Sequence, residues 1–399
     1  MRHFLVFGSH PALSLAEFCA LRPKIDQPVI CGAAALVQDP SWDGPALMNL
    51  LGGTVKLGNV AGELDLNALS AATVAELLAH RLGVQSLDFG WTAFGGSPSE
   101  RKKINGLALG FKKVLKARGI ASRWVTGKSG TEIAPAAVAK LNLTTKGLDV
   151  CLLIHADKVA IGLTTDVQDA DAWSLRDYGR PARSARSGML PPKLARIMVN
   201  LAATPEKGTL LDPFCGSGTI LMEAVLATRA TKIMGSDNAE HQIADTDKND
   251  EWLLKERIFM PQDRARLHTF MADARELSKH LPASSLDRVV TEGYLGPPLS
   301  GHETQQEIRQ NAERITQLWA ESLKAWRPLL KPQARLVMIW PGFRTAHGHA
   351  FVDLAPQLES LGYRLLATCN GRPGSKTSLI YQRPNQHVTR RIVMVEPIS

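Results

Sequence analysis

Residues 210–219 read Leu-Leu-Asp-Pro-Phe-Cys-Gly-Ser-Gly-Thr, and this stretch decides the fold of the second half of the chain. Two apolar residues end a short strand, and a turn with two glycines leads into an apolar helix that begins near Thr219. A glycine turn at the end of a strand lets a ligand approach the backbone closely, and the helix behind it offers unpaired amide groups. The pattern therefore predicts a strand-turn-helix unit that binds a ligand.

The loop differs from two common glycine loops. Leu221 stands where a dinucleotide-binding loop has its third glycine or alanine, and the loop lacks the lysine of a phosphate-binding loop. An aspartate at the loop entrance instead favours a cationic ligand such as S-adenosylmethionine, which carries a sulfonium and an amino group. The alternative is an ordinary joint with an incidental aspartate. The residues that we predict to bind this cofactor here are Asp212, Phe214, Gly216 and Gly218.

Strands and helices alternate around this loop, which is typical of an α/β doubly wound sheet with ligands at the carboxyl ends of its strands. A last antiparallel pair of strands is expected over 378–381 and 390–395. The other strands are expected over 209–211, 232–236, 266–271, 288–291, 335–340 and 363–368, and the helices over 191–203, 219–229, 239–256, 303–330 and 351–361.

Acidic residues recur where four of these strands end, at Asp212, Asp237, Asp273 and Glu292. Because the carboxyl ends of parallel strands meet at one edge of a sheet, we expect the four side chains to gather there. Asp237 suits the ribose hydroxyls of the cofactor, and Asp273 suits its adenine amine. Each aspartate taken alone could instead be a simple cap at a strand end.

The segment 291–298, Thr-Glu-Gly-Tyr-Leu-Gly-Pro-Pro, follows the fourth of these strands. Methylation of an exocyclic amine needs an acceptor for its N–H and an aromatic face that holds an extruded base. Glu292 and Tyr294 offer both, so we predict that they are catalytic. The alternative is a tight loop with an exposed tyrosine.

The first half of the chain reads as small α+β units, with helices expected over 67–81 and 105–118, and it carries much of the net charge of +9. The basic residues from 101 to 131 are interrupted by no acid, which is the pattern of a surface that binds a polyanion. A second basic run, from 176 to 196, contains only one acid; a solvated helix face is the alternative for such runs. The residues that we predict to bind RNA are Lys112, Lys113, Lys116, Arg118, Arg123 and Arg183.

Cysteine usage and hydropathy narrow the class of protein further. The five cysteines are scattered and form no C-x-x-C pair, and no His/Cys cluster indicates a metal, so we predict none. No apolar run reaches the roughly 20 residues of a membrane span, and no secretory leader is evident. We therefore expect a cytoplasmic protein with no membrane partner.

Four motifs resemble the THUMP-domain RNA methyltransferases, within them the tRNA guanosine-10 N2-methyltransferase group. The resemblance covers nearly the whole chain. It implies a ferredoxin-like domain over 1–60, a THUMP-like RNA-binding domain over 61–170, a linker over 171–187 and a Rossmann-like class I methyltransferase domain over 188–399. The four motifs are Leu-Gly-Gly-Thr-Val-Lys at 51–56, Gly-Met-Leu-Pro-Pro-Lys at 188–193, the loop at 212–219 and Tyr-Gln-Arg-Pro at 381–384.

The sequence departs from this group at the catalytic motif, which in the family usually reads Asp-Pro-Pro-Tyr. Here Glu292-Gly-Tyr294 follows the strand, and Pro297-Pro298 comes a few residues later. Since Glu292 directly follows the strand, we interpret it as the replacement for the aspartate and Tyr294 as the replacement for the aromatic residue.

The resemblance implies transfer of a methyl group from S-adenosylmethionine to the N2 amine of a guanosine in tRNA, at position 10. It implies tRNA as partner and leaves open a small activating protein subunit. Two alternatives remain. One is a DNA methyltransferase acting on adenine or cytosine amines, and the other is an RNA-binding protein with weakened catalysis.

Overall fold

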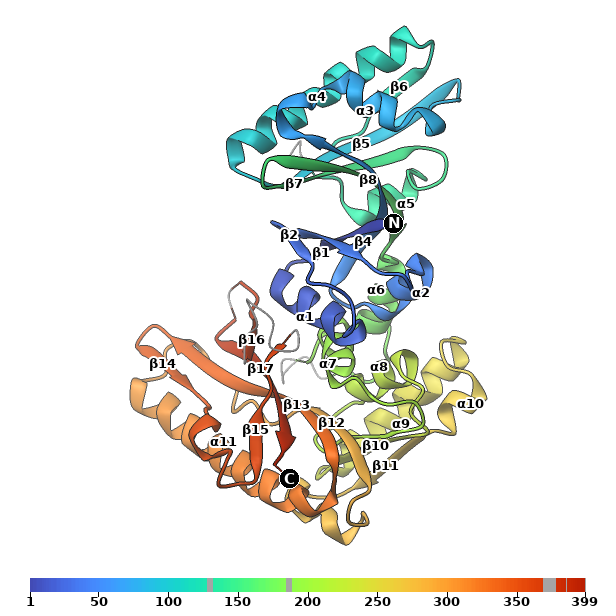
Figure 1. Cartoon of the computed structure of the whole chain (residues 1–399). Coiled ribbons are helices and arrows are strands. Elements are labelled where there is room, and N and C mark those ends of the chain that lie inside the picture. Colours follow the sequence, from blue (N-terminus) through green and yellow to red (C-terminus); the bar gives the residue numbers. More distant parts are fainter. Residues whose placement is uncertain (128–131, 184–188, 369–377, 385, 399) are drawn as a thin grey trace. The chain divides into compact units, whose positions relative to one another are not determined.

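The computed structural model describes residues 1–127, 132–183, 189–368, 378–384 and 386–398 (Figure 1). The chain divides into two compact units. Unit 1 comprises Met1–Ser14 and Lys24–Ala172, and unit 2 comprises Leu15–Pro23 and Trp173–Ser399. Helix α1 (Pro11–Leu21) contributes residues to both.

Unit 1 is built on one eight-stranded sheet in the order β2-β3-β1-β4-β8-β7-β5-β6. Strand β5 runs parallel to β6 and β7, and the other neighbours pair antiparallel. The strands are β1 (Arg2–Phe7), β2 (Val29–Cys31), β3 (Ala34–Gln38), β4 (Thr54–Asp65), β5 (Ser86–Gly95), β6 (Ala121–Trp124), β7 (Leu148–His155) and β8 (Lys158–Val167), and the helices are α2 (Gly44–Leu50), α3 (Ala71–Leu77), α4 (Pro98–Ala117) and α5 (Pro135–Lys140).

Strand β4 links the two parts of this sheet. It pairs with β1 on one side and with β8 on the other, and its twelve residues include positions 60 and 61, where the sequence placed a domain boundary. The two expected N-terminal domains therefore share one continuous sheet. Helix α6 (Ala170–Tyr178) occupies part of the stretch 171–187 that the sequence assigned to a linker.

Helix α4 begins at Pro98, seven residues before its predicted start at 105. The prediction missed a capping box, in which the Ser97 side chain accepts from the Glu100 amide and the Glu100 carboxylate accepts from the Ser97 amide. Its apolar face is buried through Ile104, Ala108, Phe111 and Leu115 in the core beneath it. Figure 1 shows α3 and α4 side by side over the end of the sheet formed by β5 and β6.

The stretch 67–81, which the helical spacing of its apolar residues favoured as one helix, forms a helix of only seven residues, α3. Short 3₁₀ turns at Leu66–Ala68 and Ala79–Arg81 flank it. Ser70 starts α3 with its own capping box to Thr73, because a serine side chain satisfies the first amides best at a helix start rather than in a helix interior.

Unit 2 contains a mostly parallel sheet in the order β11-β10-β9-β12-β13-β17-β15. The first five strands pair parallel, and β17 pairs antiparallel with both of its neighbours. Strands β14 and β16 add to β13 and β17. The strands are β9 (Thr209–Asp212), β10 (Lys232–Asp237), β11 (Leu267–Met271), β12 (Leu286–Glu292), β13 (Leu330–Thr345), β14 (Gly348–Phe351), β15 (Tyr363–Leu365), β16 (Ser378–Tyr381) and β17 (Val388–Pro397).

Helices cover both faces of this sheet, as the strand-helix alternation predicts. Val289 of β12 lies in the core that α11 covers, whereas its neighbour Arg288 donates to the Ala202 and Ala203 carbonyls at the end of α7. Successive side chains of a strand point to opposite faces, so α11 and α7 lie on opposite sides. The helices of unit 2 are α7 (Pro192–Ala202), α8 (Thr219–Ala227), α9 (Glu240–Lys255), α10 (Pro261–Arg264) and α11 (Gln305–Trp326).

The helix predicted over 351–361 is wrong. Phe351 ends strand β14, and only a 3₁₀ turn at Ala355–Gln357 follows. Pro356 would fall inside the predicted helix, where it lacks an amide hydrogen and clashes with the preceding turn. Strand β13 is also longer than predicted and continues to Thr345, where it turns back into β14.

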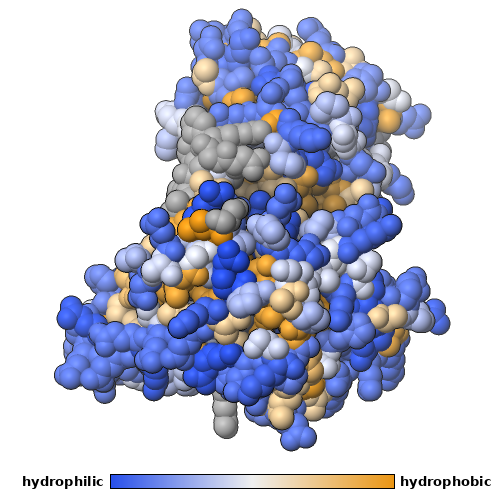
Figure 2. All heavy atoms as spheres, turned by 60° about the horizontal axis from the view of Figure 1, so that its bottom comes forward, coloured by the Kyte–Doolittle hydropathy of each residue, from blue (hydrophilic) through white to orange (hydrophobic). Residues whose placement is uncertain are grey.

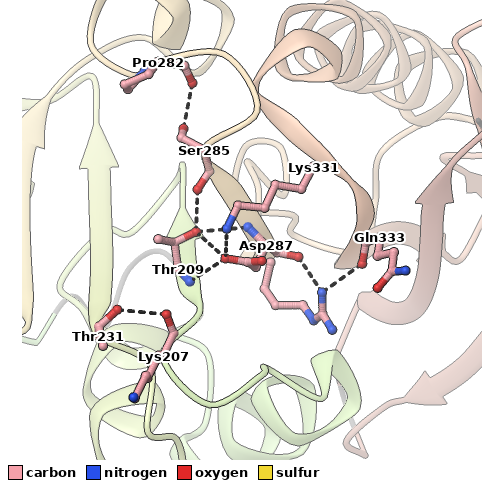
Figure 3. Close-up of polar contacts among 9 residues, drawn as sticks. Lys207, Thr209, Thr231, Pro282, Ser285, Asp287, Lys331 and Gln333 are labelled. Carbon is pink, nitrogen blue, oxygen red and sulfur yellow. Dashed lines mark hydrogen bonds and ion pairs between the residues drawn. The ribbon is translucent and has the colours of Figure 1, made fainter.

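Three strands are joined at their amino ends by a cluster around Asp287 (Figure 3). The Asp287 carboxylate accepts from the Lys331 ammonium at 2.7 Å and from the Thr209 amide at 2.9 Å, so it connects β12 with β13 and β9. The Thr209 hydroxyl also donates to the Ser285 carbonyl at 2.6 Å. These contacts lie at the opposite end of β9 from Asp212.

Hydrophilic side chains cover most of the face shown in Figure 2, with apolar side chains scattered among them. None of the helices in the described part of the chain combines the length and the apolar character that crossing a bilayer requires.

Candidate active site

A pocket of about 950 Å³ opens at the carboxyl ends of β9, β10 and β12 in unit 2. The order of the sheet reverses at β9, since β10 lies on one side of it and β12 on the other. Open α/β sheets bind their ligands at such a reversal. All four acidic residues that the sequence singled out, Asp212, Asp237, Asp273 and Glu292, line this one pocket, so the structure gathers them as predicted.

The glycine loop between β9 and α8 has the backbone that its sequence indicates. Gly216 and Gly218 have φ angles of +52° and +84°, which residues other than glycine rarely adopt. A Cβ atom on Gly216 would find its nearest neighbour 3.7 Å away, at the Gln242 side chain, so this part of the loop leaves open space beside the backbone. The neighbouring Cys215 is buried.

Asp212 is buried at the floor of the pocket, with 1% of its surface exposed. Its Oδ1 accepts from the Thr291 hydroxyl at 2.7 Å and from the Phe214 amide at 3.1 Å. Burial raises the pKa of Asp212 to about 7, and the hydrogen bonds only partly oppose this. Such a carboxyl group gains from a cationic ligand, because the ligand would supply the positive charge that the described protein does not place beside it.

The other two aspartates have structural partners as well. Asp237 accepts from the amides of Gly216 at 3.1 Å and Ala239 at 3.0 Å, so it fastens the glycine loop to the end of β10. Asp273 forms an ion pair with Arg275 at 2.8 Å, and this contact holds the pKa of Asp273 below its usual value. The sequence left a strand-end cap as the alternative for each aspartate. Asp237 and Asp273 both make local contacts at their strand ends and also line the pocket.

Glu292 has a partner that the sequence did not reveal. Its Oε1 accepts from Arg390 Nε at 2.6 Å, and its Oε2 accepts from Nη2 of the same guanidinium over a longer distance of 3.4 Å. Burial raises the pKa of Glu292, and Arg390 opposes that shift. Arg390 is 98 positions away along the chain and pairs in register beside Pro341, so only the antiparallel insertion of β17 brings it here.

The loop after Glu292 places Tyr294 at the pocket with 48% of its surface exposed. Gly293 lies against the Trp319 indole, where a Cβ atom would come within 2.7 Å of the ring. Phe214, from the glycine loop, packs on Trp319 and Trp326 with ring centroids 5.7 and 6.3 Å apart. The catalytic-loop candidates and the glycine loop are thus supported by the same aromatic cluster of α11.

The predicted RNA-binding residues occupy two places. Lys112, Lys113 and Lys116 are exposed on α4 of unit 1, and no acidic residue of the described chain pairs with them. Two further predicted RNA-binding residues of unit 1, Arg118 and Arg123, already have partners within the protein. The Arg118 guanidinium donates to the Ala75 carbonyl, and Arg123 forms an ion pair with Asp88.

Arg183 belongs to unit 2, where it is exposed and lies over the Tyr178 ring at 5.2 Å. Three other arginines of the second basic run are buried and so do not contribute to the exposed patch that we expected, whereas Lys193 is exposed. Arg176 and Arg196 are buried and both pair with Glu223, at 2.9 and 2.6 Å. Arg180 is buried as well. Arg186, a further member of this run, lies outside the described residues, as does Cys369.

Within the described ranges, no group of three or more His, Cys, Asp or Glu side chains is placed to hold a metal ion. Four of the five cysteines are described, and each is a buried free thiol.

One comparison with known proteins falls within unit 2. Residues 180–344 match the family model described as RMKL-like, methyltransferase domain. A stretch of 104 residues, 25% of this chain, is 38% identical to the tRNA (guanine(10)-N2)-dimethyltransferase of Methanocaldococcus jannaschii. A stretch of 62 residues, 16% of this chain, is 42% identical to the protein of the same name from Methanothermobacter thermautotrophicus. These matches cover only 27% and 18% of the relatives' own lengths.

The crystal structure of TrmN from Thermus thermophilus aligns over 100% of both chains, with a TM-score of 0.51 and 16% sequence identity. At this identity the likeness concerns the fold alone. It agrees with a Rossmann-like methyltransferase fold in unit 2.

Proposed function

We propose that this chain is an S-adenosylmethionine-dependent methyltransferase that acts on the exocyclic N2 amine of a guanosine in tRNA, at position 10. The observation that carries the proposal is the pocket in which Asp212, the glycine loop and the Glu292 loop meet. The matches to a methyltransferase-domain family and to two curated tRNA (guanine(10)-N2)-dimethyltransferases support the same reaction.

The residues present fit the cofactor. Asp212 is a buried carboxyl group without an ion pair among the described residues, as a site for a cationic amino group requires. Asp237 and Asp273 stand at the next two strand ends, where they would accept from the ribose hydroxyls and the adenine amine. When bound, the cofactor supplies a methyl group on a positively charged sulfur.

The Glu292 loop would hold the base. Arg390 holds Glu292 Oε1 at 2.6 Å and Oε2 only at 3.4 Å, so Oε2 is the oxygen that would accept an N–H of the guanosine amine and then take its proton. Tyr294, exposed at the pocket, would stack on the extruded base. Both groups act by positioning the amine toward the methyl donor, and such positioning accounts for much of the rate gain in group transfer.

Unit 1 would bind the tRNA. We assign residues 1–60 to a ferredoxin-like part and residues 61–170 to a THUMP-like part of the shared sheet, and we place the RNA contact on the α4 face that carries Lys112, Lys113 and Lys116. Unpaired lysines on an exposed helix attract phosphates without reading sequence, which suits a folded RNA. The cytoplasm is the expected location of this reaction.

The test uses the purified full chain, S-adenosylmethionine and unmodified tRNA transcripts, with nucleoside mass analysis of the product. N2-methylguanosine at position 10 in the tRNA, absent with a transcript that carries adenosine there, is the expected result. Methylation of duplex DNA instead would favour an enzyme of adenine or cytosine amines. If the chain alone is inactive and a cell extract restores activity, the activating subunit gains support.

One observation favours a second candidate, an RNA-binding protein with weakened catalysis. Glu292 replaces the shorter aspartate of the related motif, and Arg390 donates to both of its carboxylate oxygens. If the chain binds the cofactor and tRNA but forms no methylated nucleoside, either alone or with cell extract, the result would favour this second function.

A further inference from the structure

Arg180 is a buried cation that forms no ion pair with any described residue. Only 3% of its surface is exposed, and its Nε and Nη2 atoms have no hydrogen-bond partner within the described part of the chain. Nη1 donates to the Thr219 hydroxyl at 2.6 Å. Among the described residues no carboxylate lies within ion-pair distance of Arg180, since Glu223, the nearby buried acid, pairs with Arg176 and Arg196. Burial is expensive for an unpaired guanidinium, and it lowers the pKa of Arg180.

The guanidinium points to the start of helix α8. Thr219 is the first residue of that helix, and Gly218 at its N-cap has no side chain to satisfy the first amides. The first turn of a helix therefore presents free amide hydrogens and a partial positive charge. Thr219 also lines the active-site pocket. Two independent features, a buried guanidinium and a helix N-terminus, thus favour an anion at the same point.

The segment that carries Arg180 is locked against the glycine loop. The buried Asn249 side chain donates to the Ala182 carbonyl at 3.0 Å and to the Ser217 carbonyl at 2.9 Å, and it accepts from the Ala182 amide at 3.0 Å. One asparagine therefore holds the chain two residues after Arg180 beside the loop. This arrangement fixes the position of the guanidinium before any ligand arrives.

We propose that Arg180 and the first turn of α8 bind the carboxylate of the amino-acid part of S-adenosylmethionine. The inference rests on the proposed function, because it names the anion that the same pocket must accommodate. A zwitterionic amino-acid group would then have its ammonium toward Asp212 and its carboxylate toward Arg180. An RNA phosphate fits less well, because the guanidinium is buried behind Thr219, a residue that lines the pocket, and a small molecule reaches such a position more easily than a polynucleotide backbone does.

The test compares two ligands by calorimetry, S-adenosylmethionine and its decarboxylated form. The wild-type chain should bind the intact compound about 10- to 100-fold more tightly, which is the range that a charge-assisted contact supplies. Arg180→Met should lose most of this discrimination. Arg229→Met removes an equally cationic but exposed side chain beyond the other end of α8 and should keep it.

The ratio of the two affinities does not depend on how much of a variant is folded. The wild-type chain alone already shows whether the carboxylate contributes to binding. Equal affinity for both compounds in the wild type, or an unchanged ratio in Arg180→Met, would overturn the inference while leaving the proposed function intact. If the wild type binds neither compound, the proposed function fails and this inference fails with it. Weaker tRNA binding by Arg180→Met, with an unchanged ligand ratio, would point to a phosphate and would also overturn it.

Discussion

The carboxyl group of Asp212 titrates near neutrality because it is buried, and its pKa is about 7. A cationic ligand favours the ionised form, so it should bind more weakly as the pH falls below 7. We expect the dissociation constant for S-adenosylmethionine to rise by about three- to tenfold per pH unit between pH 7 and 5.5. Calorimetry across this range measures it. Asp212→Asn should bind weakly at every pH, and a flat profile in the wild type would contradict the assignment.

The same burial makes Asp212 a destabilising residue in the ligand-free protein. Its pKa is higher in the folded chain than the ordinary value of 3.8, so the penalty is absent below pH 3.8, grows as the pH rises, and is complete above pH 7. Asp212→Asn keeps the acceptor for Thr291 and Phe214, and should raise the free energy of unfolding at pH 8 by about 1–4 kcal/mol. Urea unfolding at pH 8 and pH 5 measures this. A larger gain at pH 5 would refute it.

Substitutions at Glu292 and Arg390 should affect catalysis and leave cofactor binding largely unchanged. Glu292→Ala should keep cofactor affinity within about threefold and lower kcat by at least about 100-fold, because it removes the acceptor of the amine N–H. Arg390→Met leaves a buried carboxylate without its partner, so the pKa of Glu292 should rise and activity should require a higher pH. Rate-pH profiles of both variants test this. An unshifted profile in Arg390→Met would mean that Glu292 is not the titrating group.

At the scale of elements, Asp287 holds together the amino ends of β9, β12 and β13. Burial opposes ionisation, but the Lys331 and Thr209 contacts hold the pKa of Asp287 below its usual value. Its contribution to stability is therefore present above pH 3.8 and is lost as the pH falls below the lowered value. Asp287→Ala should lower the free energy of unfolding at pH 7 by about 1–3 kcal/mol. Cofactor affinity should not change, because Asp287 lies at the edge opposite the pocket, and a loss of affinity would contradict that separation.

Element boundaries follow from local chemistry, and the sequence predicted them best where periodicity and capping agree. Strand β10 and helix α9 lie within one residue of their expected ranges. The helix expected over 351–361 failed because its apolar spacing was given more weight than Pro356. The predicted start of α4 at residue 105 was too late, because the prediction rested on apolar spacing and overlooked the capping box at Ser97.

The site could be predicted in part because strand ends in a parallel sheet converge by geometry. Asp212, Asp237, Asp273 and Glu292 needed only the strand-helix alternation to be placed together. Arg390 could not be found in this way, because its position depends on where an antiparallel strand inserts into the sheet. The burial of Arg176 and Arg196 was equally hidden, since a run of basic residues carries no local sign that Glu223 lies beneath it.

At the scale of the whole molecule, the proposed division of labour between the units makes RNA and cofactor affinity separable. Lys112, Lys113 and Lys116 of α4 belong to unit 1, whereas the pocket belongs to unit 2. Replacing the three lysines with glutamine should weaken tRNA binding and reduce the steepness of log K against log salt by about 2–3, because each phosphate contact releases a counterion.

Cofactor affinity should stay unchanged in that variant, because no substituted residue lines the pocket. The matched control replaces three exposed lysines of unit 2 with glutamine, Lys232, Lys255 and Lys324, and so removes the same charge. Filter binding between 50 and 300 mM salt distinguishes the two triple variants. If both lose affinity equally, net charge rather than the α4 face governs tRNA binding; if only the α4 variant loses it, the contact is local, and the lysines without acidic partners are where the RNA backbone lies.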